Sequence, residues 1–146
     1  MGDLVAKARE LSTRAHAGQV DKAGRPYIEH VARVAAAVSD DPEAEAVAWL
    51  HDVLEDCADE FKNALLHGFP VSTFYAVKAL TRYKGASDRK YYAGIRGNPL
   101  ALRVKLADIA DNADEARLAL LDEKTAARLR RKYAKAIATL TAPEAE

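Results

Sequence analysis

Residues 48–56 read AWLHDVLED, a run that brings one histidine and three carboxylates into an otherwise apolar helical pattern. Four residues of this region recur at helical spacing and are expected to face the core: Leu50, Val53, Leu54 and Cys57. His51 and Glu55 lie four residues apart. Asp52 and Asp56 have the same spacing, so one continuous helix would place each pair on a common face. Charge beside a core is costly unless a metal or a partner compensates it, so the segment is predicted to carry chemistry.

Length and composition favour one globular domain over residues 1–146. The 22 basic and 22 acidic residues cancel, so no overall field attracts nucleic acid or an anionic membrane. The single cysteine, Cys57, excludes an internal disulfide and is typical of a reducing compartment. No signal peptide and no apolar run of about 18 residues is visible, so a cytoplasmic protein is expected. The oligomeric state stays open, a homo-oligomer included.

The periodicity is helical almost throughout and no alternating strand pattern is present. Helices are predicted over residues 3–16, 28–38, 43–56, 60–67, 71–83, 88–95, 99–120 and 123–140. Pro42 suits a first helical turn, and Ser87 is a candidate cap for the helix that follows it. Gly18 and the run at residues 97–99, GNP, are predicted helix breaks. The sequence therefore predicts an all-α, single-domain helical bundle.

Three of the predicted helices contribute side chains suited to a divalent cation. His30 lies near the start of the second helix, His51 and Asp52 lie in the third, and Asp108 lies in the apolar segment VKLAD at residues 104–108. Two imidazoles and two carboxylates suit Mn²⁺, Fe²⁺ or Zn²⁺ and balance a divalent charge. Alone, a His-Asp dipeptide is a weak signal, because a hydrogen-bonded histidine beside a solvated aspartate has the same sequence.

The order of several motifs along the chain strengthens the prediction of a metal site. YIEH at residues 27–30, HDVLED at 51–56 and VKLAD at 104–108 resemble the H…HD…D signature of HD-domain metal-dependent phosphohydrolases. The chain is most similar to the alarmone branch, the (p)ppGpp 3′-pyrophosphohydrolase domain of RelA/SpoT proteins and their small stand-alone relatives. HAGQ at residues 16–19 and KAGRPY at 22–27 extend the resemblance, which covers roughly residues 6–113.

The resemblance implies a helical HD fold, a manganese-dependent hydrolase and a role in the stringent response. It implies a small-molecule nucleotide as the partner. It implies four metal ligands, which are His30, His51, Asp52 and Asp108. It further implies that Glu55 and Asp56 handle the attacking water, and Asn112 matches the family asparagine four residues after the last ligand.

Two departures from that family pattern fall outside the metal set. The basic pair that usually precedes the loop lysine is Val20-Asp21 here, and an Arg-Thr pair after the asparagine is Asp114-Glu115. Both changes remove groups that would contact the nucleotide in the family.

Phosphate binding needs cations besides a metal. Lys22, Arg25, Lys105 and Arg103 are candidates, and substrate contacts are expected from Lys22, Arg25, Tyr27, Lys105 and Asn112. Glu55, one turn after His51, is placed to orient a water or to move its proton. Because Glu55 and Asp56 lie near two ligand carboxylates, repulsion is expected to favour a proton on one of the pair.

Three functions remain in view. The first is a metal-dependent phosphohydrolase acting on a nucleotide pyrophosphate such as (p)ppGpp. The second is an HD-type phosphohydrolase acting on another nucleotide or phosphorylated metabolite. The third is a non-catalytic metal- or nucleotide-binding module, which the retained carboxylates Glu55 and Asp56 disfavour.

Overall fold

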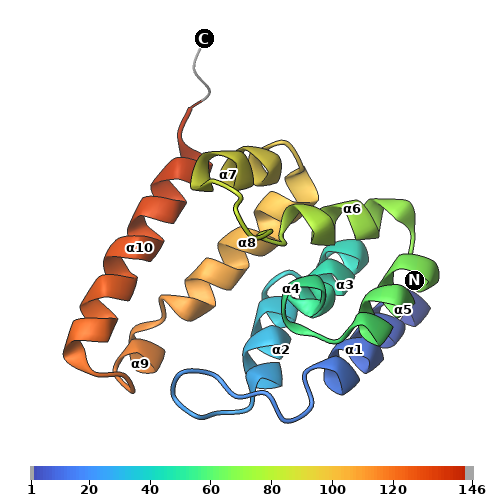
Figure 1. The fold of residues 1–146 in the computed structure, drawn as a ribbon, viewed down its shortest axis with the longest axis horizontal. Coiled ribbons are helices and arrows are strands. Elements are labelled where there is room, and N and C mark those ends of the chain that lie inside the picture. The colour runs from blue at the N-terminus through green and yellow to red at the C-terminus, as the bar shows by residue number, and fades with distance from the viewer. Residues whose placement is uncertain (1, 144–146) are drawn as a thin grey trace.

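The structure is a computed structural model that describes residues 2–143, and those residues form ten helices without a strand. Figure 1 shows their arrangement. The helices are α1 (Gly2–Ala15), α2 (Tyr27–Ala37), α3 (Pro42–Leu50), α4 (Val53–Asp56), α5 (Asp59–Gly68), α6 (Val71–Ala79), α7 (Asp88–Arg96), α8 (Pro99–Asn112), α9 (Glu115–Leu118) and α10 (Glu123–Thr141). The predicted all-α class is confirmed.

Helix α3 lies at the centre of the bundle, in contact with α1, α2, α6 and α8. Its alanines, Ala44, Ala46 and Ala48, are fully buried, and their small side chains let neighbouring helices approach closely. Trp49 is also buried. A smaller apolar cluster of Leu118, Ala126 and Leu129 joins α9 to α10 at the other end of the molecule. The site described below lies where α2, α3 and α8 meet.

Local sequence explains where several helices begin. Asp41 precedes α3, and its Oδ1 accepts from the backbone N–H of Glu43 at 3.0 Å, while Pro42 fills the first turn. Ser87 caps α7 by accepting from the N–H of Lys90 at 3.2 Å. Asn98 caps α8 in the same way. The predictions that Pro42 lies in a first helical turn and that Ser87 caps a helix are therefore confirmed.

The predicted continuous helix over residues 43–56 is wrong, because α3 ends at Leu50 and α4 begins at Val53. The Nδ1–H of His51 donates to the carbonyl of Ala48 at 2.6 Å, and the backbone N–H of His51 turns toward the same carbonyl. A side chain that competes for a backbone acceptor ends a helix locally. Asp52 adopts φ −106° and ψ 1°, outside the helical region. His51 and Asp52 thus occupy a turn, with Leu50 and Val53 fully buried on either side.

Two further predicted helices are also shorter than expected. The segment at 99–120 divides into α8 and α9, because Asp114 leaves the helix and its Oδ2 accepts from the N–H of Arg117 at 3.2 Å. The segment at 71–83 ends at Ala79. In the described part of the chain, no helix is both long and apolar enough to cross a membrane.

Candidate active site

His51 is fixed at the end of α3 with one ring nitrogen free for the site. Its Nδ1–H donates to Ala48, which leaves Nε2 for the site, 3.3 Å from Asp108 Oδ1 and 3.1 Å from Asp52 Oδ2. The side chain is buried. A hydrogen bond from one ring nitrogen is the usual way in which a protein orients a metal-ligating histidine.

His30 on α2 is held in the same manner from the opposite side. Its Nδ1–H donates to Asp111 Oδ2 at 2.6 Å, and its Nε2 lies 2.9 Å from Asp108 Oδ1. The two imidazole rings are 6.0 Å apart between centroids. Both Nε2 atoms therefore converge on one carboxylate oxygen of α8.

Asp52 completes the cluster. One potential ligand atom from each of His30, His51 and Asp52 lies within 4.8 Å of the others. The Tyr27 hydroxyl donates to Asp52 Oδ2 and so fixes that carboxylate. Asp108 contacts both histidines and is itself buried. The four predicted metal-ligand residues are thus brought together in space, and they come from three separate parts of the chain.

The electrostatics of the cluster favour a bound cation. Burial would lower the pKa of His51, but Asp52 and Asp108 raise it well above its ordinary value. Burial would likewise raise the pKa of Asp108, yet hydrogen bonds with His30 and His51 hold it well below the usual range. The carboxylates of Asp52 and Asp108 thus place negative charge where the two Nε2 atoms converge. This donor set, with both Nδ1 positions already hydrogen-bonded, fits a divalent metal.

Asp111 is a functional candidate that the sequence argument missed. Although burial raises the pKa of its carboxyl, the hydrogen bond with His30 and the bond with Arg33 lower it to about 2. Asp111 is therefore ionised and orients His30, as second carboxylates do in carboxylate–histidine–metal arrangements. Its spacing of three residues from Asp108 on a helix was an available signal, because that spacing puts both on one face.

Glu55 and Asp56 lie on α4 at the rim of the cluster, and both are exposed. Glu55 Oε1 accepts from the backbone N–H of Arg82 at 2.7 Å, and Asp56 Oδ2 accepts from Gln19 Nε2 at 3.4 Å. Partial desolvation and the negative charge of Asp52 raise the pKa of both carboxyls. The direction of these two shifts agrees with the repulsion expected from the sequence.

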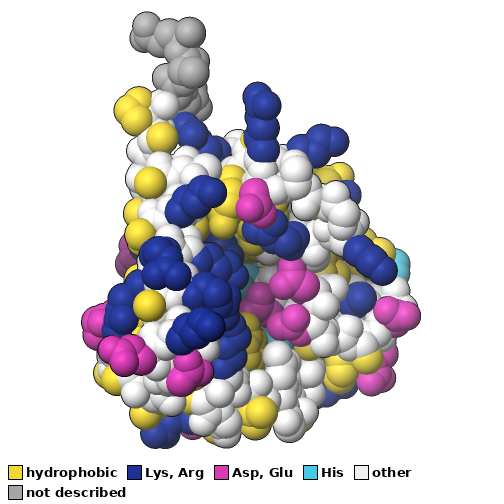
Figure 2. Space-filling model, turned by 60° about the vertical axis from the view of Figure 1, so that its left-hand side comes forward, with side chains coloured by type: hydrophobic (Ala, Val, Ile, Leu, Met, Phe, Trp, Pro, Cys, Tyr) yellow, Lys and Arg dark blue, Asp and Glu magenta, His cyan; other side chains and the backbone are white. Residues whose placement is uncertain are grey.

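A cationic cavity of about 180 Å³ opens beside the cluster. Glu55 and Asp108 lie on its wall, and its cations are Arg82, Lys105 and Lys132. Lys105 Nζ donates to Asp108 Oδ2 at 3.2 Å. Figure 2 shows Lys and Arg side chains gathered on one side of a hollow and carboxylates on the other. Tyr91 and Tyr92 form the aromatic part of its wall, and Tyr91 also belongs to the buried core.

A second cavity, of about 590 Å³, lies between the loop at residues 19–26 and the α9–α10 end. Among the predicted substrate contacts, Lys22, Arg25, Tyr27 and Asn112 line it. Its apolar wall includes Leu118, Leu121 and Leu129. Asn112 and Tyr133 line this cavity and the cationic one, so the two cavities meet along them.

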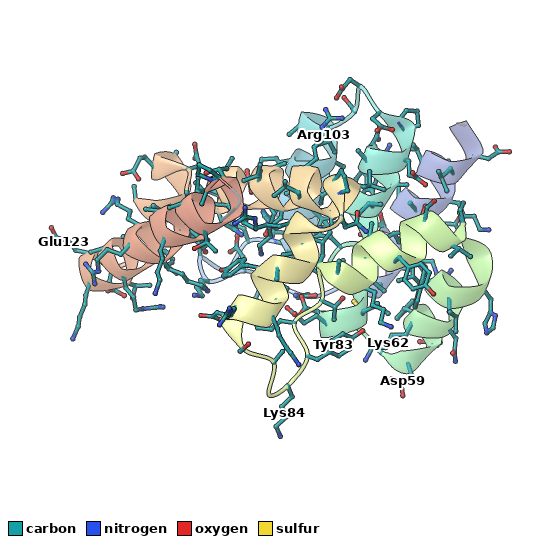
Figure 3. All side chains as sticks on the ribbon, turned by 90° about the horizontal axis from the view of Figure 1, so that it is seen from above. Asp59, Lys62, Tyr83, Lys84, Arg103 and Glu123 are labelled. Atoms are coloured by element: carbon teal, nitrogen blue, oxygen red, sulfur yellow. The ribbon has the colours of Figure 1, made fainter. Side chains whose placement is uncertain are left out.

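Two other candidate residues, Arg103 and His16, lie outside the metal-ligand cluster. Arg103 pairs with Asp40 and stands at the edge of the molecule (Figure 3), away from both cavities, which argues against its predicted role in phosphate binding. His16 is buried and contacts Gln19 Oε1 at 2.7 Å through Nδ1, and it is not part of the group of ligand atoms formed by His30, His51 and Asp52. A third cavity, of about 680 Å³, lies between α1 and α3, and none of the metal-ligand candidates lines it.

The comparisons with known proteins bear on the fold. A solved structure described as "A metazoan ortholog of SpoT hydrolyzes ppGpp and plays a role in starvation responses" superposes with a TM-score of 0.75 over 97% of this chain and 88% of that chain, at 21% identity. The two chains share one fold. The resemblance to ppGpp hydrolases that the motifs indicate is therefore confirmed at the level of the fold.

Sequence comparison finds a much longer relative. A probable GTP pyrophosphokinase of Mycobacterium leprae is 29% identical over 121 residues, which cover 75% of this chain and 15% of that protein. The chain thus corresponds to about one-seventh of that protein's length. No protein-family model matches the chain.

Proposed function

We propose that this protein is a metal-dependent phosphohydrolase that removes the 3′-diphosphate of a guanosine nucleotide such as (p)ppGpp. The observation that carries the proposal is the convergence of His30 Nε2 and His51 Nε2 on Asp108, with Asp52 beside them. The shared fold with a ppGpp-hydrolysing SpoT ortholog supports the same reaction class. In the Mycobacterium relative the matched part is 15% of the protein, so its name does not assign kinase chemistry to this segment.

Four side chains would hold the ion: His30, His51, Asp52 and Asp108. We propose Mn²⁺ as the native metal, with Fe²⁺ or Zn²⁺ as ions that the same donors accept. When bound, a divalent ion polarises a phosphoryl oxygen and makes a nearby water more acidic. The fixed Nδ1–H bonds keep both imidazoles in the tautomer that a cation requires.

The carboxylates of α4 would handle the water. Hydrolysis adds water to the phosphorus that is bonded to the 3′ oxygen, breaks that P–O bond and releases diphosphate and a 3′-hydroxyl. Glu55 or Asp56 accepts the proton that the water loses, and their raised pKa values bring them closer to the pH at which proton transfer is efficient. Lys105 neutralises Asp108 and presents positive charge to the same cavity.

The two adjoining cavities suit a nucleotide phosphorylated at more than one position. The cavity lined by Leu118, Leu121 and Leu129 offers apolar surface for a base. The cationic cavity offers Arg82, Lys105 and Lys132 for phosphate oxygens. Desolvation and the nearby positive charges of Lys22 and Lys105 lower the pKa of Lys132, which indicates that these cations crowd one space. A polyphosphate would relieve that crowding.

A second substrate class stays in view because of Asp21. Its carboxylate occupies the loop position where the resembling family places a basic residue, and it pairs with Arg117. The loop therefore lacks that basic arm for a guanine base. An HD-type phosphohydrolase acting on another nucleotide is the alternative that this observation favours. We further propose one domain over residues 1–146, a cytoplasmic location, and no nucleic-acid partner.

The function is tested by incubating the purified protein with added Mn²⁺ and a nucleotide panel of ppGpp, GTP, GDP and nucleoside monophosphates. Diphosphate release from ppGpp, abolished by a chelator and restored by Mn²⁺, is the expected result. Hydrolysis of a different nucleotide with ppGpp untouched would support the alternative. If no phosphate ester in the panel is cleaved in the metal-loaded protein, the hydrolase proposal fails.

Lys132→Ala is expected to raise the KM for the preferred nucleotide by about tenfold, because one charged contact to phosphate is lost. The kcat should change much less, since the proposed role of Lys132 is to bind phosphate and not to move a proton. Lys135→Ala is the matched control, because Lys135 is exposed on the same helix and does not line either cavity. Steady-state kinetics with equal KM values for both variants would remove Lys132 from substrate binding.

A further inference from the structure

Arg117 on α9 bridges the loop at residues 19–26 and the metal-ligand cluster of His30, His51, Asp52 and Asp108. Its Nη2 donates to Asp21 Oδ2 at 3.0 Å. Its Nη1 lies 2.9 Å from Asp111 Oδ2 and 2.9 Å from Asn112 Oδ1. The Arg117 side chain is 21% exposed, and those of Asp21 and Asp111 are 11% and 14% exposed. These ion pairs are therefore largely shielded from water, unlike ordinary surface pairs.

On the side of the loop, Arg117 binds the carboxylate of Asp21, which also accepts hydrogen bonds from the loop backbone. Asp21 Oδ1 accepts from the N–H groups of Ala23 at 2.9 Å and Arg25 at 3.0 Å. The backbone N–H of Asp21 donates to the carbonyl of Arg25 at 2.8 Å, and Gly24 takes φ +83° inside this turn. Because one carboxylate makes both sets of contacts, fixing Asp21 fixes the whole loop against α9.

At the other end, Arg117 holds the carboxylate that orients a metal ligand. Asp111 Oδ2 accepts both from Arg117 Nη1 and from the Nδ1–H of His30. Its other oxygen accepts from Arg33 Nε at 2.8 Å, but the Arg33 side chain is 46% exposed. Of the two arginines on Asp111, only Arg117 also reaches the loop. An unbroken chain of contacts thus runs from the loop to the ring of His30.

We propose that Arg117 is a positioning residue that sets the 19–26 loop and the His30 ring together, so that closure of the nucleotide cavity and metal affinity are coupled. Asp21 is linked to His30 through Arg117, whose Nη1 lies 3.3 Å from His30 Nδ1 and 2.9 Å from the Asp111 carboxylate that also contacts His30. The inference rests on the proposed metal site. The inference adds to that site a role of the 19–26 loop in retaining the metal.

The test measures Mn²⁺ affinity by competition with a chelator and loop opening by hydrogen exchange at the N–H groups of Ala23 and Arg25. Arg117→Ala is expected to weaken Mn²⁺ binding by about tenfold or more, the range seen when a metal-ligand's hydrogen-bond partner is disturbed. The same variant should speed exchange in the loop. Asp21→Asn keeps an acceptor for the loop N–H groups but removes the negative charge that pairs with Arg117, and it should weaken Mn²⁺ binding by about threefold.

Two control variants separate coupling from general damage. Arg33→Ala removes the second arginine from Asp111 without touching the loop, so loop exchange should stay at the wild-type rate. Glu115→Gln breaks the exposed pair with Arg130, close to Arg117 in sequence, and should change neither readout. Melting temperatures establish that each variant is folded.

The outcomes distinguish this inference from the proposed function. Wild-type protein that binds no Mn²⁺ overturns the proposed metal site and this inference together. Wild-type protein that binds Mn²⁺, with Asp21→Asn binding it equally well, overturns the coupling and leaves the metal site standing. Faster loop exchange with unchanged Mn²⁺ affinity in Arg117→Ala also overturns it, because Arg117 would then hold the loop alone.

Discussion

Asp108→Ala is expected to lose bound Mn²⁺ and to reduce hydrolysis to the background rate. Asp108 is the carboxylate on which both imidazole Nε2 atoms converge, at 2.9 Å from His30 and 3.3 Å from His51. Its removal leaves one ligand carboxylate, Asp52, to balance a divalent charge. It also leaves the Lys105 ammonium inside the cluster without its partner, and this positive charge repels a cation.

Asp108→Asn distinguishes the effect of the lost charge from an effect on folding, because it keeps the size of the side chain and a carbonyl acceptor for Lys105. It should lose the metal while staying folded. His51→Ala should behave alike, and His67→Ala is the matched control, since His67 is an exposed histidine outside the site. Elemental analysis and turnover are measured on the same preparations. Equal metal content in wild type, Asp108→Asn and His51→Ala would refute the ligand assignment.

Glu55→Gln is expected to lower kcat by about 10²–10⁴, the usual cost of losing general acid–base assistance. Gln keeps the carbonyl oxygen that accepts from the N–H of Arg82, so the local structure should persist. Metal content and KM should change little, because Glu55 is not among the proposed ligands and its contribution belongs to the transition state. Steady-state kinetics and elemental analysis, run on matched samples, measure these quantities.

Asp56→Asn tests whether the two carboxylates act together. If they do, the double variant should lose less activity than the product of the two single losses. Glu60→Gln is the control, since Glu60 is exposed on α5 outside both cavities. Near-wild-type turnover in Glu55→Gln and Asp56→Asn would mean that α4 is only a solvated acidic turn.

Thermal stability gives a further check on the two carboxylate variants. Desolvation and the charge of Asp52 raise the pKa of Glu55 and Asp56 in the folded protein. An acid with a raised folded-state pKa weakens stability as the pH rises past its unfolded value, because ionisation costs more in the folded state. At neutral pH, the neutral amide variants without metal should therefore melt no lower than the wild type. A loss of activity with retained stability points to chemistry rather than to damage.

The helical class of the fold was predictable, because apolar spacing and capping residues are local properties. Asp41-Pro42, Ser87 and Asn98-Pro99 mark helix starts that the structure contains. The break after Leu50 was not predictable from spacing, because it depends on the His51 ring bonding to the Ala48 carbonyl. The end of α8 likewise depends on Asp114 bonding to the backbone of Arg117. Side-chain competition for backbone groups is decided by conformation and not by periodicity.

For the site, the sequence by itself determined which residue types are available: two histidines and two aspartates at motif spacing, with Glu55 and Asp56 one turn further on. Only the tertiary structure decided that α2, α3 and α8 bring His30, His51, Asp52 and Asp108 into one cluster. It also decided the role of Asp111 and the bridge made by Arg117, whose partners lie 6 and 96 residues away. The physical reason is that metal ligation and ion pairing depend on distances in space, and packing of helices sets those distances between residues far apart in the chain.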